Sequence, residues 1–301
     1  MPFQSFLFLL FISTAALIIV CFFAARIRNR ANLIFEKKSR YHHIMVYEDG
    51  FIRTLRLGKD YEAGKQSRVD IRFPHNLILE YTKLVFSGLL INDRPDSILI
   101  IGLGGGAIPR AFNRYFPETK IDVVDIDPDV LDVAEKYFLF KAGKNINTHI
   151  SDGRIFVENI INSDLPVKYD MIILDAFDSS SIPGHLLSKE FLELIAQIMN
   201  PEGVIAANVL SDNSLFHSII KTYRKVFGRC YVFIGEQAKN AVLVTPGKDA
   251  PDLVHKEVME KAYYLNKNHD FNFSITSVVR KLRWGYRSKK LSKVLKDSQK
   301  T

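Results

Sequence analysis

The chain has 301 residues, 47% of them hydrophobic, with a net charge of +8 and two cysteines. Two cysteines exclude a disulfide framework and form no metal-ligand pair, so we expect no metal. The charge is confined to the ends, because residues 26–40 carry +5 and residues 280–301 carry +8, which leaves −5 on residues 41–279. A mildly acidic middle argues against nucleic-acid binding, whereas basic ends suit an anionic membrane surface. A solvated, partly disordered C-terminal end is the alternative.

The first predicted element is an apolar segment. Residues 5–23 contain no charged side chain, and three arginines follow them. The segment is close to the length that spans the hydrocarbon core of a bilayer, whereas a signal peptide would need basic residues before a shorter run. We therefore expect an uncleaved transmembrane anchor over residues 1–25 and a basic linker over residues 26–40. Because basic flanks stay in the cytoplasm, we expect a single-pass membrane protein with its globular, catalytic part on the cytoplasmic side.

A small β-rich module followed by a helix is predicted for residues 41–94. Apolar and polar residues alternate through residues 44–57 around Asp49-Gly50, which is the pattern of a β-hairpin. Residues 76–91 have the apolar spacing of a helix.

Strand and helix patterns alternate through residues 95–250. The predicted strands cover residues 97–104, 120–127, 147–153, 169–177, 203–210, 230–235 and 240–247, and the helices cover residues 107–116, 128–138, 154–161, 188–199 and 213–227. This alternation predicts an α/β domain with a doubly wound, mostly parallel sheet. We expect a helical extension over residues 251–280 and a basic tail over residues 281–301.

A glycine-rich turn follows the first strand of this domain and contains Gly102, Gly104, Gly105 and Gly106. Glycine lets the backbone approach a ligand and adopt dihedral angles that other residues resist. The next helix presents free N–H groups at its start. Tight packing of strand on helix is the alternative use of such glycines.

Acidic residues follow the next strands at the same edge of the sheet. Asp125 ends the second strand, Asp152 the third, and Asp175 and Asp178 the fourth. A carboxylate after the second strand can accept hydrogen bonds from both hydroxyls of a ribose, and one after the third can accept from an adenine amino group. The residues expected to contact a nucleoside are Gly102, Gly104, Gly105, Gly106, Asp125, Ile126, Asp152, Gly153 and Asp175. Because the turn lacks the G-x-G-x-x-G spacing, adenosine on a sulfonium carrier fits better than a dinucleotide.

These motifs resemble those of the spermidine synthase (polyamine aminopropyltransferase) family, which has the class I methyltransferase-like Rossmann fold. Val124–Asp127 matches the family's V-E-I-D, residues 152–156 its D-G-x-x-F, and residues 175–178 its D-S-x-D. The resemblance covers residues 41–245 and is strongest over residues 97–210. It implies a small N-terminal β-module, decarboxylated S-adenosylmethionine as co-substrate and a small amine such as putrescine as acceptor.

The resemblance also implies roles for the acidic residues. Asp125 would hold the ribose and Asp152 the adenine. Asp178 would orient and deprotonate the attacking amine, with Asp175 as the second candidate for catalysis and a loop cap as the alternative role of Asp178. His185, which follows this loop, either touches the acceptor or is a surface or capping residue.

Two departures from the family concern the substrates. Gln66 and Tyr81 are the tentative amine-binding residues, but Thr82-Lys83 stand where the family has His-Glu after the tyrosine. Gly105 stands where the family has an acid that binds the amine of the decarboxylated donor. Without that acid, the turn offers backbone donors, which suit the carboxylate of intact S-adenosylmethionine.

Three hypotheses follow from these observations. The first is a spermidine synthase-like aminopropyltransferase, and the second is a methyltransferase that uses S-adenosylmethionine. The third is a membrane-tethered binding protein that keeps the nucleoside site without chemistry. The oligomeric state stays open, with a homodimer as one option.

Overall fold

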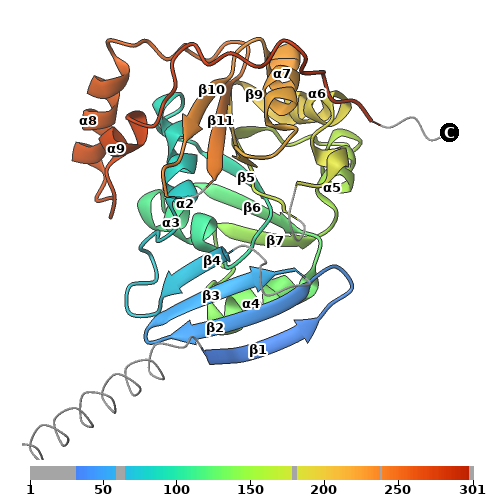
Figure 1. Ribbon diagram of the computed structural model, residues 1–301, viewed down its shortest axis with the longest axis vertical. Helices are drawn as coiled ribbons and strands as arrows, with labels where there is room; N and C mark the ends of the chain where they lie inside the picture. Colours follow the sequence, from blue (N-terminus) through green and yellow to red (C-terminus); the bar gives the residue numbers. More distant parts are fainter. Residues whose placement is uncertain (1–31, 59–64, 178–181, 238, 298–301) are drawn as a thin grey trace, which may run out of the picture.

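A computed structural model describes residues 32–58, 65–177, 182–237 and 239–297 (Figure 1). Within these residues, two sheets lie one above the other, with the smaller sheet at the bottom of the view. The smaller sheet is antiparallel, in the order β1-β2-β3-β4. Its strands are β1 (Asn32–Lys38), β2 (His43–Asp49), β3 (Ile52–Leu57) and β4 (Lys65–Asp70). The predicted hairpin around Asp49-Gly50 is confirmed, since β2 pairs antiparallel with β3.

The larger sheet has the order β10-β11-β9-β8-β5-β6-β7. Its strands are β5 (Ser97–Ile101), β6 (Lys120–Asp125), β7 (Ile146–Ile150), β8 (Tyr169–Leu174), β9 (Met199–Leu210), β10 (Tyr231–Ile234) and β11 (Asn240–Pro246). Strands β7, β6, β5, β8 and β9 are each parallel to the next. Strand β11 is antiparallel to both of its neighbours, β9 and β10. The predicted mostly parallel sheet is therefore confirmed.

Helices cover both faces of this sheet. They are α2 (Glu80–Leu84), the 3₁₀ helix η1 (Val85–Leu90), α3 (Ala107–Tyr115), α4 (Pro128–Tyr137), α5 (Gly153–Ile161), the 3₁₀ helix η2 (Gly184–Leu186), α6 (Lys189–Ile198), α7 (Phe216–Phe227), α8 (Val258–Asn268) and α9 (Ile275–Val279). Side chains alternate between faces along a strand. Ile98 and Ile100 accordingly belong to the core shared with α3, α4 and the small sheet. Leu99 and Ile101 belong to the core under α5, α6 and α7.

Two expectations about the N-terminal half need correction. The predicted linker over residues 26–40 contains strand β1, which pairs antiparallel with β2. The basic residues that suggested a linker lie among apolar residues, and Ile34 and Phe35 pack against the core. The helix predicted over residues 76–91 is helical only from Glu80, and it changes to a 3₁₀ helix at Val85.

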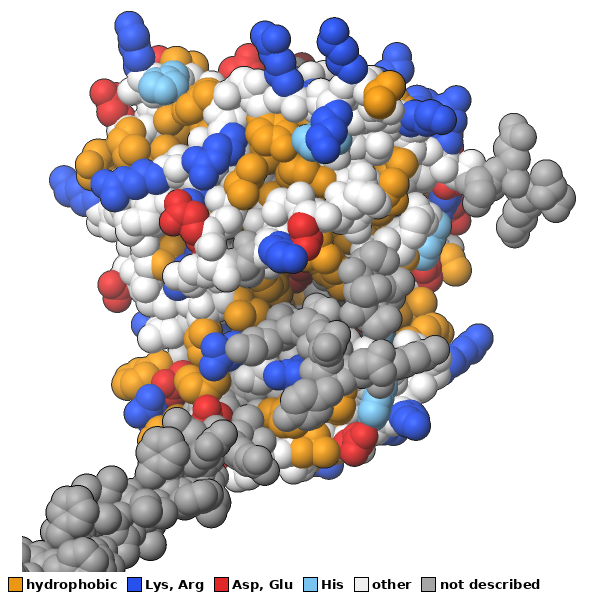
Figure 2. Space-filling model, in the orientation of Figure 1, with side chains coloured by type: hydrophobic (Ala, Val, Ile, Leu, Met, Phe, Trp, Pro, Cys, Tyr) orange, Lys and Arg blue, Asp and Glu red, His pale blue; other side chains and the backbone are white. Residues whose placement is uncertain are grey.

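The structure describes only part of the two chain ends on which the predicted membrane contact rests. No helix among the described residues is long and apolar enough to cross a membrane, and residues 5–23, on which the predicted anchor rests, lie outside the described part. On the face shown in Figure 2, Lys and Arg side chains gather over the upper, C-terminal part of the molecule. The described part of the predicted basic tail does not extend freely into solvent, because residues 292–297 form hydrogen bonds with α6 and α7.

Candidate functional site

A cavity lies at the carboxyl edge of the large sheet, beside the point where β5 stands between β6 and β8. Its cavity volume is about 190 Å³, and it opens to solvent. The predicted site residues that line it are Gln66, Tyr81, Gly102, Gly104, Asp125, Ile126, Asp152, Gly153, Asp175 and His185. The topology therefore brings together residues from both sheets at the edge where α/β proteins bind ligands.

The glycine turn forms the floor of this cavity. Gly102 has φ 102°, and a Cβ there would overlap with the carbonyl group of Asp175. Gly104 has φ 53° and also lines the cavity. Glycine is required at both positions, because L side chains disfavour positive φ and because the ends of β5 and β8 approach closely at Gly102.

Gly105 and Gly106 were predicted to contact the nucleoside, but neither lines the cavity in the described residues. A Cβ at Gly105 would lie 2.7 Å from Ser67 Oγ and 2.9 Å from a ring carbon of Phe138. A Cβ at Gly106 would lie 2.5 Å from the ring of Phe140. These two glycines thus let the turn pack against β4 and against the segment after α4.

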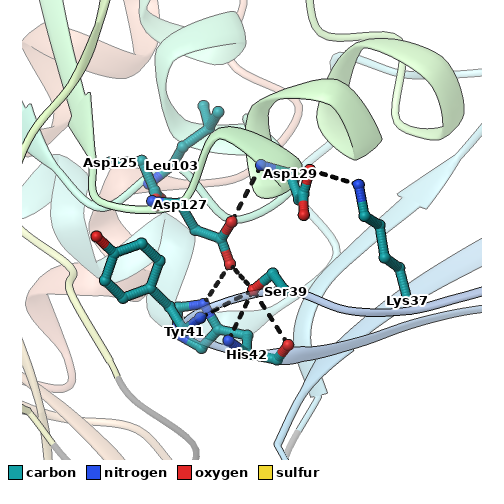
Figure 3. Close-up of polar contacts among 8 residues, drawn as sticks. All are labelled: Lys37, Ser39, Tyr41, His42, Leu103, Asp125, Asp127 and Asp129. Atoms are coloured by element: carbon teal, nitrogen blue, oxygen red, sulfur yellow. Dashed lines mark hydrogen bonds and ion pairs between the residues drawn. The ribbon is translucent and has the colours of Figure 1, made fainter.

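Asp125 is held in place before any ligand binds (Figure 3). One carboxylate oxygen accepts a hydrogen bond from the Leu103 amide at 2.8 Å, and the other accepts from the Asp127 amide at 3.0 Å. Burial raises the pKa of the Asp125 carboxyl, although these two hydrogen bonds oppose the shift. The carboxylate keeps further lone pairs, which can accept hydrogen bonds from ribose hydroxyls.

Asp127 joins the small sheet to the domain of the large sheet (Figure 3). Its side chain caps α4 through the Asp129 amide and also accepts a hydrogen bond from the Ser39 hydroxyl at 2.5 Å. The same oxygen lies 2.9 Å from His42 Nδ1, and the Asp127 side chain is 1% exposed. An ion pair between Lys37 and Asp129 lies beside this contact. The segment between β1 and β2 is therefore fixed against the strand end that carries Asp125.

Sequence reasoning missed Tyr41 and His42, which this contact places in the cavity wall. The Asp127 carboxylate orients the His42 ring through Nδ1, so that Nε2 is the nitrogen left for other partners. The pairing of Asp127 with a residue 85 positions away follows from tertiary structure alone. The sequence signal for Asp127 was its position before Pro128, which indicated only a helix cap.

Asp152 caps α5 and faces the cavity. Its Oδ1 accepts hydrogen bonds from the Arg154 and Ile155 amides, at 2.9 and 3.1 Å. Its Oδ2 lies 2.8 Å from His185 Nε2. His185, which was expected either to touch the acceptor or to be a surface or capping residue, therefore pairs with the predicted adenine-binding acid.

Asp175 directly follows β8, and the protein environment changes the proton affinity of its carboxyl. Burial raises the pKa of its carboxyl to about 7, against hydrogen bonds from Asn208 and Tyr81 that lower it. Asn208 Nδ2 donates at 2.8 Å, and the side chain of Asn240 donates to Asn208 in turn. The Tyr81 hydroxyl also lies 3.0 Å from the Gln66 carbonyl oxygen, and its single proton can be donated to only one of these two acceptors at a time. A carboxylate with a pKa near neutrality can exchange a proton with a substrate at physiological pH.

Asn208 was not predicted, although its amide stands out in the apolar strand around it. Asp178, the first candidate for catalysis, lies outside the described residues. No group of three or more His, Cys, Asp or Glu side chains in the described ranges could hold a metal ion.

The fold and the cavity define a nucleoside-binding enzyme of the class I methyltransferase type. A family model described as the spermine/spermidine synthase domain matches residues 79–244. A polyamine aminopropyltransferase of Vibrio vulnificus is 37% identical over 222 residues, which are 72% of this chain and 72% of the relative. The chain belongs to the spermine/spermidine synthase family. The predictions of this family and of a transferase that uses S-adenosylmethionine or its decarboxylated form are confirmed.

Methyltransferases are also among the similar proteins. The human eEF1A lysine and N-terminal methyltransferase is 29% identical over 206 residues, and the match spans 64% of this chain and 30% of that protein. The crystal structure of human methyltransferase-like protein 13 with SAH has a TM-score of 0.59 at 29% identity, covering 64% of this chain and 92% of that one. A probable spermidine synthase from Corynebacterium glutamicum has a TM-score of 0.65 at 19% identity, covering 79% of this chain and 87% of that one, and shows the shared fold.

Proposed function

We propose that this protein transfers the aminopropyl group of decarboxylated S-adenosylmethionine to a small amine such as putrescine. The observation that carries the proposal is Asp175, a cavity-lining carboxyl whose pKa burial raises to about 7. An alkylamine is mostly protonated at pH 7, so transfer needs a neighbouring group that accepts its proton. The family relationship supports the same reaction.

Each part of the cavity has a role in this reaction. Asp125 accepts hydrogen bonds from the ribose hydroxyls, and Asp152 accepts one from the adenine amino group. The amine nitrogen attacks the carbon bound to the sulfonium sulfur, the carbon–sulfur bond breaks, and its electron pair stays on sulfur, which leaves 5′-methylthioadenosine. Asp175 takes the proton that the amine loses, with Asp178 as the second acid of the loop. The protein mainly holds the reactants in line, because the sulfonium is already a good leaving group.

Steady-state kinetics of Asp175→Asn tests the proposed base. We expect kcat to fall by about 10²-fold or more, since general-base catalysis contributes on that order. Asp270→Asn, which removes an exposed acid far along the chain, is the matched control. A kcat of Asp175→Asn equal to that of the control would refute the role of Asp175. Asp178→Asn, assayed beside it, tests the second acid.

Methyl transfer is the alternative, and Gly105 is the observation that favours it. A side chain at this position would collide with Ser67 and Phe138, so the family's donor-selecting acid has no room here. Calorimetric titration of the full-length protein in detergent with the intact and the decarboxylated donor separates the two reactions. A tenfold preference corresponds to about 1.4 kcal/mol, which one charged contact can supply. Preference for the intact donor would replace aminopropyl transfer by methyl transfer, and donor binding without turnover would favour the binding protein.

We also propose that residues 5–23 anchor the protein in a membrane, with the catalytic domain on the cytoplasmic side. The support is the uncharged run and the arginines that follow it. Alkaline carbonate extraction of membranes that contain the full-length chain tests this proposal. Release into the soluble fraction would refute an integral anchor. Light scattering on the detergent-extracted protein measures the oligomeric state, for which a homodimer is the option to test.

A further inference from the structure

The C-terminal segment over residues 283–297, here called the strap, crosses the face of the molecule formed by α5, α6 and α7. In Figure 1 it is the dark red chain that passes over α7 and α6 before it ends at the right. The strap lies outside residues 79–244, which match the family model. Its contacts are therefore a feature of this chain beyond the family domain.

Backbone hydrogen bonds fix the end of the strap. The Leu295 amide donates to Thr222 Oγ1 at 2.9 Å, and the Leu295 carbonyl accepts from the Lys189 amide at 2.8 Å. The Asp297 amide donates to Glu190 Oε2 at 2.8 Å. The strap thus binds both α7 and the first turn of α6.

The last described residue of the strap meets the first turn of α5. Arg154 Nη1 and Nη2 donate to the two carboxylate oxygens of Asp297 at 2.8 and 2.7 Å. Paired hydrogen bonds of this kind fix the orientation of both groups. The Arg154 guanidinium lowers the pKa of the Asp297 carboxyl, so the pair stays ionised at neutral pH.

Arg154 connects this pair to the nucleoside cavity. Its amide donates to Asp152 Oδ1, and its Nη1 lies 3.5 Å from the His185 carbonyl oxygen. His185 Nε2 in turn lies 2.8 Å from Asp152 Oδ2. Both carboxylate oxygens of Asp152 are therefore linked to Arg154. The Arg154 amide holds Oδ1, and His185, whose carbonyl lies beside the Arg154 guanidinium, holds Oδ2.

We propose that Asp297 is a positioning residue: through Arg154, it fixes the wall of the donor cavity to which Asp152 belongs. The inference rests on the proposed nucleoside site, but it does not depend on which group is transferred. Asp297 does not line the donor cavity, so its loss should weaken the binding of the adenosine part of the donor and leave the chemical step intact.

Binding of 5′-methylthioadenosine to the full-length protein, measured by calorimetry, tests the proposal. This probe contains the adenosine and the sulfur of the donor without the transferred group. For Asp297→Asn we expect an increase of Kd of about fivefold, the order of one well-aligned ion pair, and restoration by Asp297→Glu. Donor KM should rise by a similar factor, with kcat at saturating donor unchanged.

Two control variants separate positioning from general stability. Glu158→Gln removes the other acid that the Arg154 guanidinium contacts, at 3.1 Å, and should leave the strap bound. Leu291→Ala changes a strap residue that is 93% exposed. Both should bind the probe within about twofold of wild type, the scale of an exposed pair. Thermal melting of each variant gives its stability independently.

A double-mutant cycle with Arg154→Ala decides the case. If Asp297 acts through Arg154, removing both residues should raise Kd no more than removing Arg154 alone. Additive effects on Kd, or an unchanged Kd for Asp297→Asn with a lowered melting temperature, would overturn the positioning role. Failure of the wild type to bind the probe would instead refute the nucleoside site itself, and with it the proposed function.

Discussion

Replacing Asp175 by asparagine should change how the stability of the protein depends on pH. Burial raises the pKa of this carboxyl from 3.8 to about 7 in the folded protein. Between these two values the folded chain binds more protons at this position than the unfolded chain does. The free energy of unfolding that Asp175 contributes therefore falls as the pH rises from about 4 to 7, and it is constant above that range.

The size of the expected change in the free energy of unfolding follows from the pH interval over which Asp175 titrates. One pKa unit corresponds to about 1.4 kcal/mol, so the interval from pH 5 to 7 corresponds to a ceiling of about 3 kcal/mol. Asp175 lines an open cavity, so solvent reduces the part of its pKa shift that contributes to the free energy of unfolding. We expect wild type to lose about 1–2 kcal/mol relative to Asp175→Asn between pH 5 and pH 8.

Urea unfolding of both proteins at several pH values measures this difference. Subtracting the two curves cancels the other titrating groups, because they are common to both chains. A difference that stays flat between pH 5 and 8 would mean that Asp175 ionises at its ordinary pKa, and the argument for Asp175 as the base would fail. The pH dependence of kcat offers a second check, since activity should rise through about pH 7 in the wild type.

Three further substitutions test the geometry of the site. Asp125→Asn should raise the Kd of the adenosine donor about tenfold or more in calorimetry, because hydrogen bonds to a charged acceptor contribute about 1.5–3 kcal/mol; an unchanged Kd would contradict ribose binding at this position. Gly102→Ala should lower the free energy of unfolding by about 2–4 kcal/mol in urea titration, because its Cβ meets the Asp175 carbonyl at a positive φ; wild-type stability would contradict the close approach. Ser39→Ala should leave the buried Asp127 carboxylate one donor short and lower the melting temperature by about 2–4 °C, as about 1 kcal/mol does in a chain of this size; an unchanged melting curve would mean that water replaces the hydroxyl.

The doubly wound domain could be predicted because its signals are local. Strands β5, β8 and β9 contain apolar runs, and the helices that follow them have apolar faces of their own, so the alternation itself fixes the fold class. The positions of Asp125, Asp152 and Asp175 follow from the same rule, because residues after parallel strands meet at one edge.

The remaining features depend on contacts between distant parts of the chain. Strand β1 lies in a segment whose composition is basic, and only its pairing with β2 makes it a strand. His42 reaches the cavity because Asp127 holds it, and Asp297 reaches α5 because the strap crosses two helices. No periodicity in the sequence encodes pairings between residues so far apart.

Gly105 shows that a sequence can reveal the absence of a side chain without revealing what occupies its place. Its lack of a side chain was predicted to expose backbone donors to a ligand, but the space beside it is filled by Ser67 and Phe138. A carboxylate at this position would therefore require β4 to move away from the glycine turn. The other polar groups that line the cavity, and that a donor could meet, include Gln66 and His42.

The three described acids at the cavity are all engaged before a ligand arrives. Asp125 accepts from two amides, Asp152 caps a helix, and Asp175 accepts from Asn208. Groups held in this way need little reorganisation when the donor binds. Most of the free-energy cost of orienting them is therefore offset during folding and not during binding. In the proposed site, the half that binds the nucleoside is thus built into the strand ends of the fold, and it would serve aminopropyl and methyl transfer equally well. The difference between these reactions therefore depends on the few side chains that meet the other end of the donor, and substitutions there should change the choice of donor without changing the affinity for adenosine.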